Sequence, residues 1–257
     1  MDFLKILKSF EEFVYEALTW LILFPRTEMR IVMHPGRMTQ YAAAELSGDE
    51  VGRFKDAISP PLLLILCVLL AHMVDLGIRA QAPDTSGSLA SVLLASENNL
   101  LLYRTIAFGI WALAGAVYLL ARSDERIDRE SLRPPFYEQC YLVAPFALLM
   151  SLSTSLLLLA SDEAKAAAGC LFLGGALWFW YVQASWIRRK TSLPWWRSVV
   201  AGVAIVAAGS LVNAGLGHVL TQTRLHGSPA ASPAASGPER RSDQGWMPEG
   251  LSAFRSV

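Results

Sequence analysis

The chain alternates between long apolar blocks and short polar connections. Uncharged blocks of 19 to 22 residues, interrupted only by Asp75 and Arg104, occupy residues 60–78, 101–121, 141–160, 166–186 and 199–220. A helix needs about 20 consecutive apolar residues to cross a hydrocarbon core about 30 Å thick. The pattern therefore predicts an all-α polytopic membrane protein, with five transmembrane helices in a membrane domain over residues 59–220.

The N-terminal segment, residues 3–24, has an apolar face but carries charges that break its apolar run. Fewer than ten uncharged residues follow Glu16, which is too short to span a membrane. We predict an amphipathic helix that lies in the membrane interface, is anchored by Trp20 and is ended by Pro25. A re-entrant segment or a sixth span is the alternative. Residues 1–58 are then a cytoplasmic N-terminal region.

Prolines precede three of the predicted spans. They occur in Ser59-Pro60-Pro61, in Arg133-Pro134-Pro135 and in Leu193-Pro194. Proline is tolerated in the first turn of a helix, where its missing N–H would have no partner. After the fifth span, residues 221–257 are rich in Pro, Ala, Ser and Gly, a composition that predicts a disordered C-terminal tail.

Basic residues alternate between the connections and predict the orientation. The segment before the first span and the loops after the second and fourth spans together carry 15 Lys and Arg, whereas the other two loops carry only Arg79 and Lys165. The positive-inside rule therefore places the N-terminus in the cytoplasm and, with five spans, the C-terminus outside. We expect a bacterial inner membrane protein.

Charge and motifs exclude several function classes. The net charge is zero, so no basic excess favours nucleic acid as a partner. The three cysteines form no metal-binding spacing, and no catalytic or nucleotide-binding motif occurs. We therefore expect no metal, no cofactor and no enzymatic activity. The lipid bilayer is the expected partner, together with a possible protein partner in the membrane, and the oligomeric state stays open.

Polar residues inside predicted spans are the default functional candidates. The candidate polar cluster comprises His72, Asp75, Arg104, Asn213 and His218, and an unspecific hydroxyl set comprises Ser151, Ser153, Thr154 and Ser155. Asp75 and Arg104 each lie three residues from the outer end of adjacent spans, which is roughly 5 Å deep. The cluster is either a substrate or ion site open to the outside, or a structural ion pair with interfacial groups.

Small residues predict close helix packing at Gly202, Gly209 and Gly217 of the fifth span. Gly174-Gly175 in the fourth span is a candidate partner, and dimerisation is the alternative. Aromatic residues gather at the end of the fourth span and the start of the fifth, at Trp178, Phe179, Trp180, Tyr181, Trp186, Trp195 and Trp196. They indicate an interfacial aromatic belt, with a ligand-stacking site as the alternative.

The layout resembles the Yip-type integral membrane domain family over roughly residues 50–220. The acidic and proline-containing start of the first span, Asp56-Ala57-Ile58-Ser59-Pro60-Pro61, is similar to the acidic, proline-containing motif of that family. The resemblance implies five spans, a cytoplasmic N-terminal region and a C-terminus on the far side. Eukaryotic members of that family engage small GTPases, but no residue that would bind a GTPase is identifiable in this sequence, so we do not predict that partner.

The function expected from these patterns is a non-enzymatic scaffold or accessory subunit of a membrane assembly. The alternative is a small permease or channel that uses the polar cluster near the outer side.

Overall fold

The computed structural model describes residues 3–48, 53–79, 97–123, 126–159 and 161–227. Within these ranges the chain is all-helical, as predicted, with seven helices and no strand. Their bounds are α1 Phe3–Met33, α2 Pro35–Ser47, α3 Pro60–Arg79, α5 Glu97–Arg122, α6 Arg129–Leu156, α7 Asp162–Thr191 and α8 Trp195–Gly227. Among these described helices, α3, α5, α6, α7 and α8 are long and apolar enough to cross a membrane.

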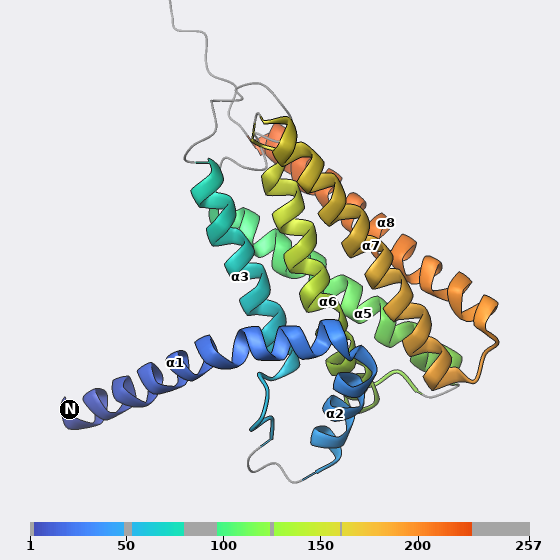
Figure 1. Ribbon diagram of the computed structural model, residues 1–257, viewed down its shortest axis with the longest axis horizontal. Coiled ribbons are helices and arrows are strands. Elements are labelled where there is room, and N and C mark those ends of the chain that lie inside the picture. Colours follow the sequence, from blue (N-terminus) through green and yellow to red (C-terminus); the bar gives the residue numbers. More distant parts are fainter. Residues whose placement is uncertain (1–2, 49–52, 80–96, 124–125, 160, 228–257) are drawn as a thin grey trace, which may run out of the picture.

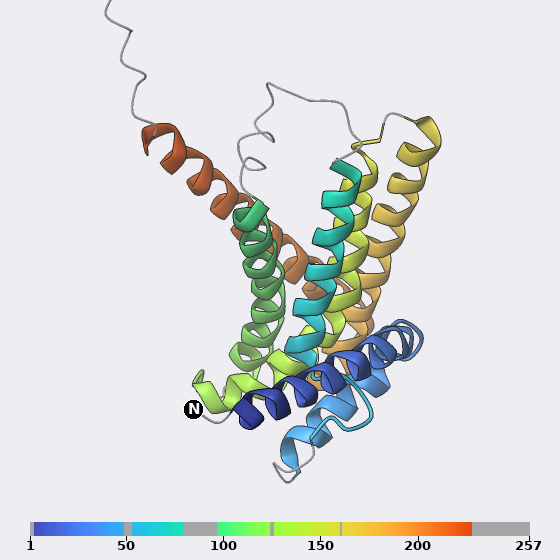
Figure 2. The ribbon, with the colours of Figure 1, turned by 90° about the vertical axis from the view of Figure 1, so that its left-hand side faces the viewer.

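The five apolar helices form one bundle in which α6 is the central element. Figures 1 and 2 show α3, α5 and α7 around α6, with their long directions roughly shared. Residues Tyr141–Ala147 of α6 are all buried. In the middle of the bundle the ring of Phe146 stacks on that of Phe179 of α7, with 4.1 Å between the centroids. Every other span can therefore be positioned by its packing against α6 or a neighbour of α6.

Helix α6 begins earlier than the sequence pattern predicts. The expected start after Arg133-Pro134-Pro135 is wrong, because both prolines lie inside the helix. The carboxylate of Asp128 accepts hydrogen bonds from the backbone N–H groups of Glu130 and Ser131 at 2.9 and 2.8 Å, and Ser131 Oγ accepts from the N–H of Asp128. This reciprocal cap starts the helix one turn before the prolines. The same hydrogen bonds hold the pKa of Asp128 below its usual range.

Helix α1 runs across the end of the bundle where α3 begins, and its N-terminal half projects beyond the bundle (Figure 1). The prediction that Pro25 ends this helix is wrong, because α1 continues to Met33. An interior proline costs about 3 kcal/mol, and tertiary contacts just after it offset that cost. The hydroxyl of Thr27 accepts from the N–H of Ile58 at 3.4 Å, and Arg30 donates to the carbonyl of Asp56 at 3.2 Å.

The segment before α3 is fastened between α1 and α6. Ala57 and Ile58 are buried, and the carbonyl of Ile58 accepts a 2.7 Å hydrogen bond from the hydroxyl of Tyr141. Helix α3 then starts at Pro60, in agreement with the proline pattern. Trp20 lies partly buried beside α3, in a groove of about 290 Å³ that the apolar side chains of α1 and α3 line, and its role as a membrane anchor stays a prediction.

Helix α8 packs on two different neighbours along its length: it starts beside α7 (Figure 1) and continues past α5 (Figure 2). An added Cβ at Gly202 would lie 3.3 Å from the backbone nitrogen of Ala184 in α7, and one at Gly209 would lie within the ring of Trp111 in α5. The two glycines therefore permit close approaches to α7 and to α5. Gly175 of α7 meets Met150 of α6 rather than α8. Gly174 has nothing described within 4 Å, and the surroundings of Gly217 lie outside the described residues.

We expect Gly209→Ala to lower the free energy of unfolding by about 1 kcal/mol, because overpacking forces a side-chain shift. The added methyl group must displace the indole of Trp111, which also donates to the carbonyl of Val206 at 3.4 Å. Unfolding in mixed detergent micelles measures the loss. Gly215→Ala is the matched control on the same helix, since its Cβ meets no described atom within 4 Å. An equal loss in both variants would contradict the close approach at Gly209.

The predicted boundary between the membrane domain and the tail also needs correction. Helix α8 continues to Gly227, several residues into the segment 221–257 that composition assigns to the tail. Residues 228–257 lie outside the described residues, so the disordered tail stays a prediction.

Candidate functional site

The first candidate site is a polar node that joins three helices at the end of the bundle opposite α1. Asp75 of α3 is fully buried and accepts a 2.6 Å hydrogen bond from the hydroxyl of Ser155 of α6. Arg104 of α5, also buried, forms a 3.4 Å ion pair with the same carboxylate. Because each partner comes from a different helix, the node fastens α3, α5 and α6 together. Ser155 belongs to the hydroxyl set that the sequence pattern left unspecific.

The other members of the candidate polar cluster lie in different surroundings. His72 is buried on α3, one turn from Asp75, and its Nδ1 has no hydrogen-bond partner among the described residues. Asn213 is buried between α8 and α5, where its side chain donates to the carbonyl of Ala107 at 3.1 Å. His218 is exposed. The structure thus brings Asp75 and Arg104 together and gives Asn213 a helix-joining role of its own.

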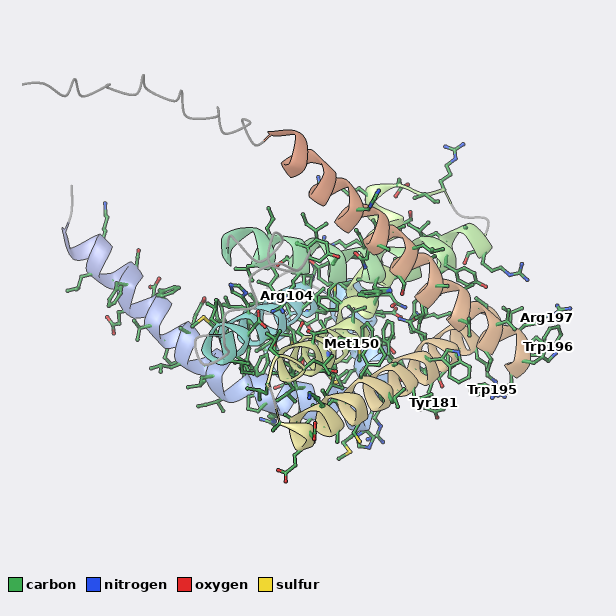
Figure 3. All side chains as sticks on the ribbon, turned by 90° about the horizontal axis from the view of Figure 1, so that it is seen from above. Arg104, Met150, Tyr181, Trp195, Trp196 and Arg197 are labelled. Atoms are coloured by element: carbon green, nitrogen blue, oxygen red, sulfur yellow. The ribbon has the colours of Figure 1, made fainter. Side chains whose placement is uncertain are left out.

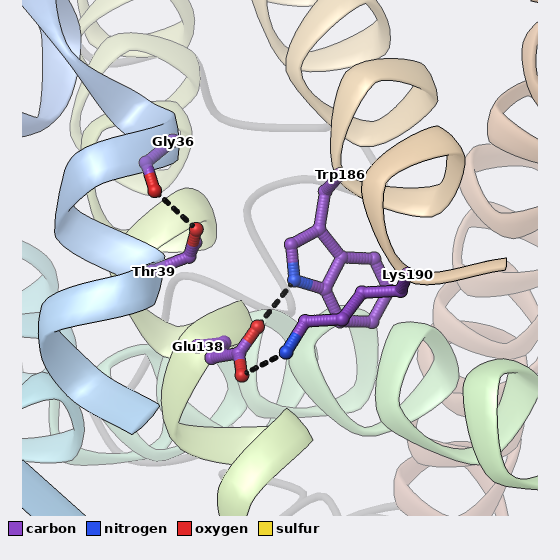
Figure 4. Close-up of polar contacts among 5 residues, drawn as sticks. All are labelled: Gly36, Thr39, Glu138, Trp186 and Lys190. Carbon is purple, nitrogen blue, oxygen red and sulfur yellow. Dashed lines mark hydrogen bonds and ion pairs between the residues drawn. The ribbon is translucent and has the colours of Figure 1, made fainter. Parts of the chain in front are cut away.

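A second buried charge, which the sequence pattern missed, lies at the α1 end of the bundle. Glu138 of α6 is 1% exposed and accepts two hydrogen bonds from α7. The indole N–H of Trp186 donates to one carboxylate oxygen at 2.7 Å, and the ammonium group of Lys190 donates to the other at 2.6 Å (Figure 4). We call these three residues the Glu138 cluster. Helix α2 lies beside it, where Thr39 bonds to the carbonyl of Gly36.

A pair of buried amides extends the contact between α6 and α7. The side chains of Gln139 and Gln183 are both fully buried and exchange two hydrogen bonds, of 3.1 and 2.6 Å. Two reciprocal bonds satisfy most of the polar atoms, which matters because an unpaired amide in an apolar environment is costly. An added Cβ at Gly115 of α5 would lie 2.5 Å from the Gln139 amide. The glycine therefore leaves room for this pair.

A third acidic residue links α1 to the first span. The thiol of Cys67 in α3 donates a 2.8 Å hydrogen bond to the carboxyl group of Glu28 in α1. Burial raises the pKa of Glu28 from 4.5 to about 7, and the hydrogen bond from Cys67 opposes part of that shift. The carboxyl group therefore changes its charge near neutral pH, at the place where α1 meets the bundle.

We expect stability to fall as the pH rises from about 4.5 to about 7, by up to about 3 kcal/mol from Glu28. The folded state keeps the proton up to a pH of about 7, whereas the unfolded state releases it near 4.5. Between these values the free energy of unfolding therefore decreases as the pH rises. Unfolding measured across this pH range tests the slope. Glu28→Gln should flatten the slope and exceed the wild type in stability at the upper end. Exposed Glu16 supplies the control Glu16→Gln, which should keep the wild-type slope.

Sequence reasoning missed these residues at the α1 end for identifiable reasons. Glu138 and Gln139 precede the predicted third block, which begins at residue 141, so they counted as part of a loop. Gln183 lies inside the fourth block but carries no charge. A signal was present in the segment Glu138-Gln139, which follows the two prolines and directly precedes an uninterrupted apolar run.

The aromatic residues of α7 and of the first turn of α8 divide between the core and the surface. Phe179 and Trp186, both assigned to an interfacial belt from the sequence, are instead fully buried. Tyr181, Trp195 and Trp196 are exposed, and Figure 3 shows them projecting from one edge of the bundle together with Arg197. Phe179 and Trp186 therefore cannot contribute to a belt, whereas the exposed residues and the partly exposed Trp178 and Trp180 can. Among the described residues, no group of three His, Cys, Asp or Glu is placed to hold a metal ion.

Comparisons with known proteins leave the family open. Neither a protein-family model, nor a curated protein, nor a solved structure matches the chain. The resemblance to the Yip-type domain therefore stays a prediction. Function has to be inferred from the five apolar helices, which are compatible with an integral membrane protein, and from the polar contacts between them.

Proposed function

We propose that this integral membrane protein is a non-enzymatic scaffold or accessory subunit of a membrane assembly. One observation carries the proposal: buried polar side chains of the spans bond to other helices of the same bundle. Asp75 and Arg104 bond across α3, α5 and α6, Glu138 bonds to α7, and Asn213 joins α8 to α5. Polar groups used in this way stabilise a frame.

Helix α1 supplies an exposed surface through which the scaffold can contact the membrane or a partner. Its N-terminal half projects beyond the bundle, and its large apolar side chains are exposed, among them Phe10, Phe13 and Leu18. We propose that this helix lies in the membrane interface, since it runs across the ends of the spans. The same end of the bundle carries the 15 basic residues, which supports a cytoplasmic N-terminus and an outer C-terminus.

Purification of the full chain from its native membrane tests the scaffold role. We expect a membrane protein to co-purify in a fixed ratio, and the abundance of that protein to fall when the chain is deleted. The second measurement separates a true subunit from a contaminant, because orphaned subunits are degraded. A chain that purifies without any partner in a fixed ratio, and whose deletion leaves the membrane proteome unchanged, would contradict the proposal.

A reporter enzyme fused after Val257 tests the orientation separately. It should be active on the outer side, because 15 of the 17 basic residues in and before the short loops lie on the other side. A reporter that is active only in the cytoplasm would mean either that the number of spans is not five or that the bundle has the opposite orientation. A fusion within the loop around residue 192, between α7 and α8, is the control and should report the cytoplasmic side.

A small permease or channel is the second candidate, and His72 favours it. A buried imidazole whose Nδ1 finds no described partner, one turn from a buried carboxylate, is the kind of group that proton pathways use. Proton flux into liposomes, followed with an enclosed pH-sensitive dye, discriminates between the candidates. A permease would show a flux that His72→Ala lowers, whereas a scaffold would show no flux above that of empty liposomes.

A further inference from the structure

A basic and aromatic pocket opens where α7 ends and α8 begins. Its volume is about 610 Å³, and it is lined by Tyr181, Ser185, Arg188, Arg189 and Trp195. Three residues connect the two helices, because α7 ends at Thr191 and α8 begins at Trp195. The pocket therefore collects side chains from the last turns of one span and the first residue of the next.

The two guanidinium groups of the pocket are available to an anion. Neither Arg188 nor Arg189 forms an ion pair with a described acidic side chain, although Lys190 beside them pairs with Glu138. The guanidinium of Arg188 lies over the ring of Trp195, 5.8 Å from its centroid. The guanidinium of Arg189 lies against Gly36 of α2, where an added Cβ would be only 3.1 Å away from it. These contacts position the two charges, and Glu138 attracts Arg189 from a distance without forming an ion pair with it.

Other groups around the pocket favour the same kind of ligand. Ser185 and Tyr181 contribute hydroxyl groups that can donate hydrogen bonds. Helix α7 ends at the pocket and helix α8 begins there, so the opposite ends of the two helix dipoles largely cancel and the guanidinium groups dominate the local charge. No acidic side chain is among the residues that line the pocket. The lining thus combines two positive charges with neutral donors, which suits a phosphate group.

The pocket lies at the level where phospholipid headgroups meet the hydrocarbon core. By length and composition, the candidate spans in α7 and α8 end at Thr191 and begin at Trp195, which places the pocket at one end of both spans. The exposed rings of Tyr181 and Trp195 lie 6.4 Å apart at this edge (Figure 3), and such amphipathic rings prefer the interface. Further from the pocket, Leu177 is exposed one turn before Tyr181 on the same side of α7. Val203 is exposed about two turns after Trp195 on α8.

We propose that this pocket binds the phosphate headgroup of an anionic phospholipid, whose acyl chains lie along the exposed apolar faces of α7 and α8. Basic pockets between spans on the cytoplasmic side suit such headgroups, and the planar fork of arginine matches the phosphate oxygens. A free phosphate would use the same charges but would leave the apolar faces below the pocket without a role. The site does not depend on the scaffold role.

Retention of lipid by the full chain tests the site. The protein is placed in nanodiscs with equal amounts of phosphatidylcholine and phosphatidylglycerol, and native mass spectrometry counts the lipids that it keeps. We expect the wild type to keep phosphatidylglycerol and Arg188→Gln/Arg189→Gln to keep about tenfold less, since each basic residue near the surface adds to the attraction. Arg122→Gln, an exposed charge at the same end of α5, is the matched control and should lose less than about twofold.

Two further arms keep the result decisive if the double variant folds poorly. In the wild type, phosphatidylglycerol with a photoreactive acyl chain should label residues near Leu177 and Val203. Inorganic phosphate added to phosphatidylcholine discs should neither bind measurably nor displace the anionic lipid. The proposal is overturned by equal retention of both lipids in the wild type, by an equal loss in Arg122→Gln, by labelling spread evenly over the spans, or by displacement with inorganic phosphate.

Discussion

Glu138→Leu is expected to lower the free energy of unfolding by about 3 kcal/mol. Glu138 is 1% exposed and accepts hydrogen bonds from Trp186 and Lys190. Removing its carboxylate leaves the fully buried indole N–H of Trp186 without an acceptor and an ammonium group without its counter-charge. An unsatisfied buried donor costs about 1–3 kcal/mol, and breaking a buried ion pair costs about 3–5 kcal/mol. Lys190 is partly exposed and can turn to water, which keeps the loss near the lower value.

Graded variants separate the two contributions within the Glu138 cluster. Glu138→Gln keeps an acceptor for Trp186 but loses the charge, so we expect a loss of about 1 kcal/mol. Lys190→Met in the Glu138→Leu background should add little further loss, because its charge no longer has a partner in the cluster. Glu163→Gln on the exposed first turn of α7 is the control and should stay within about 0.5 kcal/mol of the wild type. Unfolding in mixed micelles measures all four, and an unchanged Glu138→Leu would contradict the cluster.

Asp75→Asn and Arg104→Gln are each expected to lower the free energy of unfolding by about 2 kcal/mol. Either change leaves the other charge buried beside a neutral side chain, in a medium where an unpaired charge is expensive. The double variant should lose about 1 kcal/mol less than the sum of the two single losses, because the pair is disrupted only once. The node lies near one end of the spans rather than at their centre, which moderates the cost.

The serine of this node offers a check on its third contact. Ser155→Ala removes the 2.6 Å hydrogen bond to Asp75 and should cost about 0.6 kcal/mol, a typical value between membrane helices. Thr154→Ala is the matched control on the neighbouring position, where the hydroxyl bonds to its own helix at the carbonyl of Ser151.

A double-mutant cycle of Asp75 and Arg104 that proves additive would mean that the two side chains do not stabilise each other.

These measurements also bear on the choice between scaffold and permease. A scaffold uses Asp75, Arg104 and Glu138 for stability, so their substitution should lower stability with no transport phenotype. A permease would show a change in proton flux at Asp75 or His72 under conditions where the protein remains folded. Stability and flux recorded on the same preparations therefore separate the two roles.

The amino-acid sequence by itself determined the parts of this protein that depend on local composition. Runs of about twenty apolar residues specify membrane helices, because no other structure satisfies the backbone of such a run inside lipid. Matched positions near the ends of adjacent spans were enough to pair Asp75 with Arg104. The small residues Gly202 and Gly209 marked the faces of α8 that pack closely. All of these inferences need only helix geometry and the thickness of a membrane.

Only the tertiary structure decided which neighbours complete each polar group. The sequence pattern places Glu138 in a loop. In the structure it is buried, because α7 brings Trp186 and Lys190 into hydrogen-bond contact with it. The sequence pattern predicts that Pro25 ends a helix. The helix instead continues past Pro25, because contacts of α1 with the segment before α3 offset the cost of the proline. A charge or a proline has a local cost that composition reveals, whereas the contacts that offset it come from residues distant in the chain.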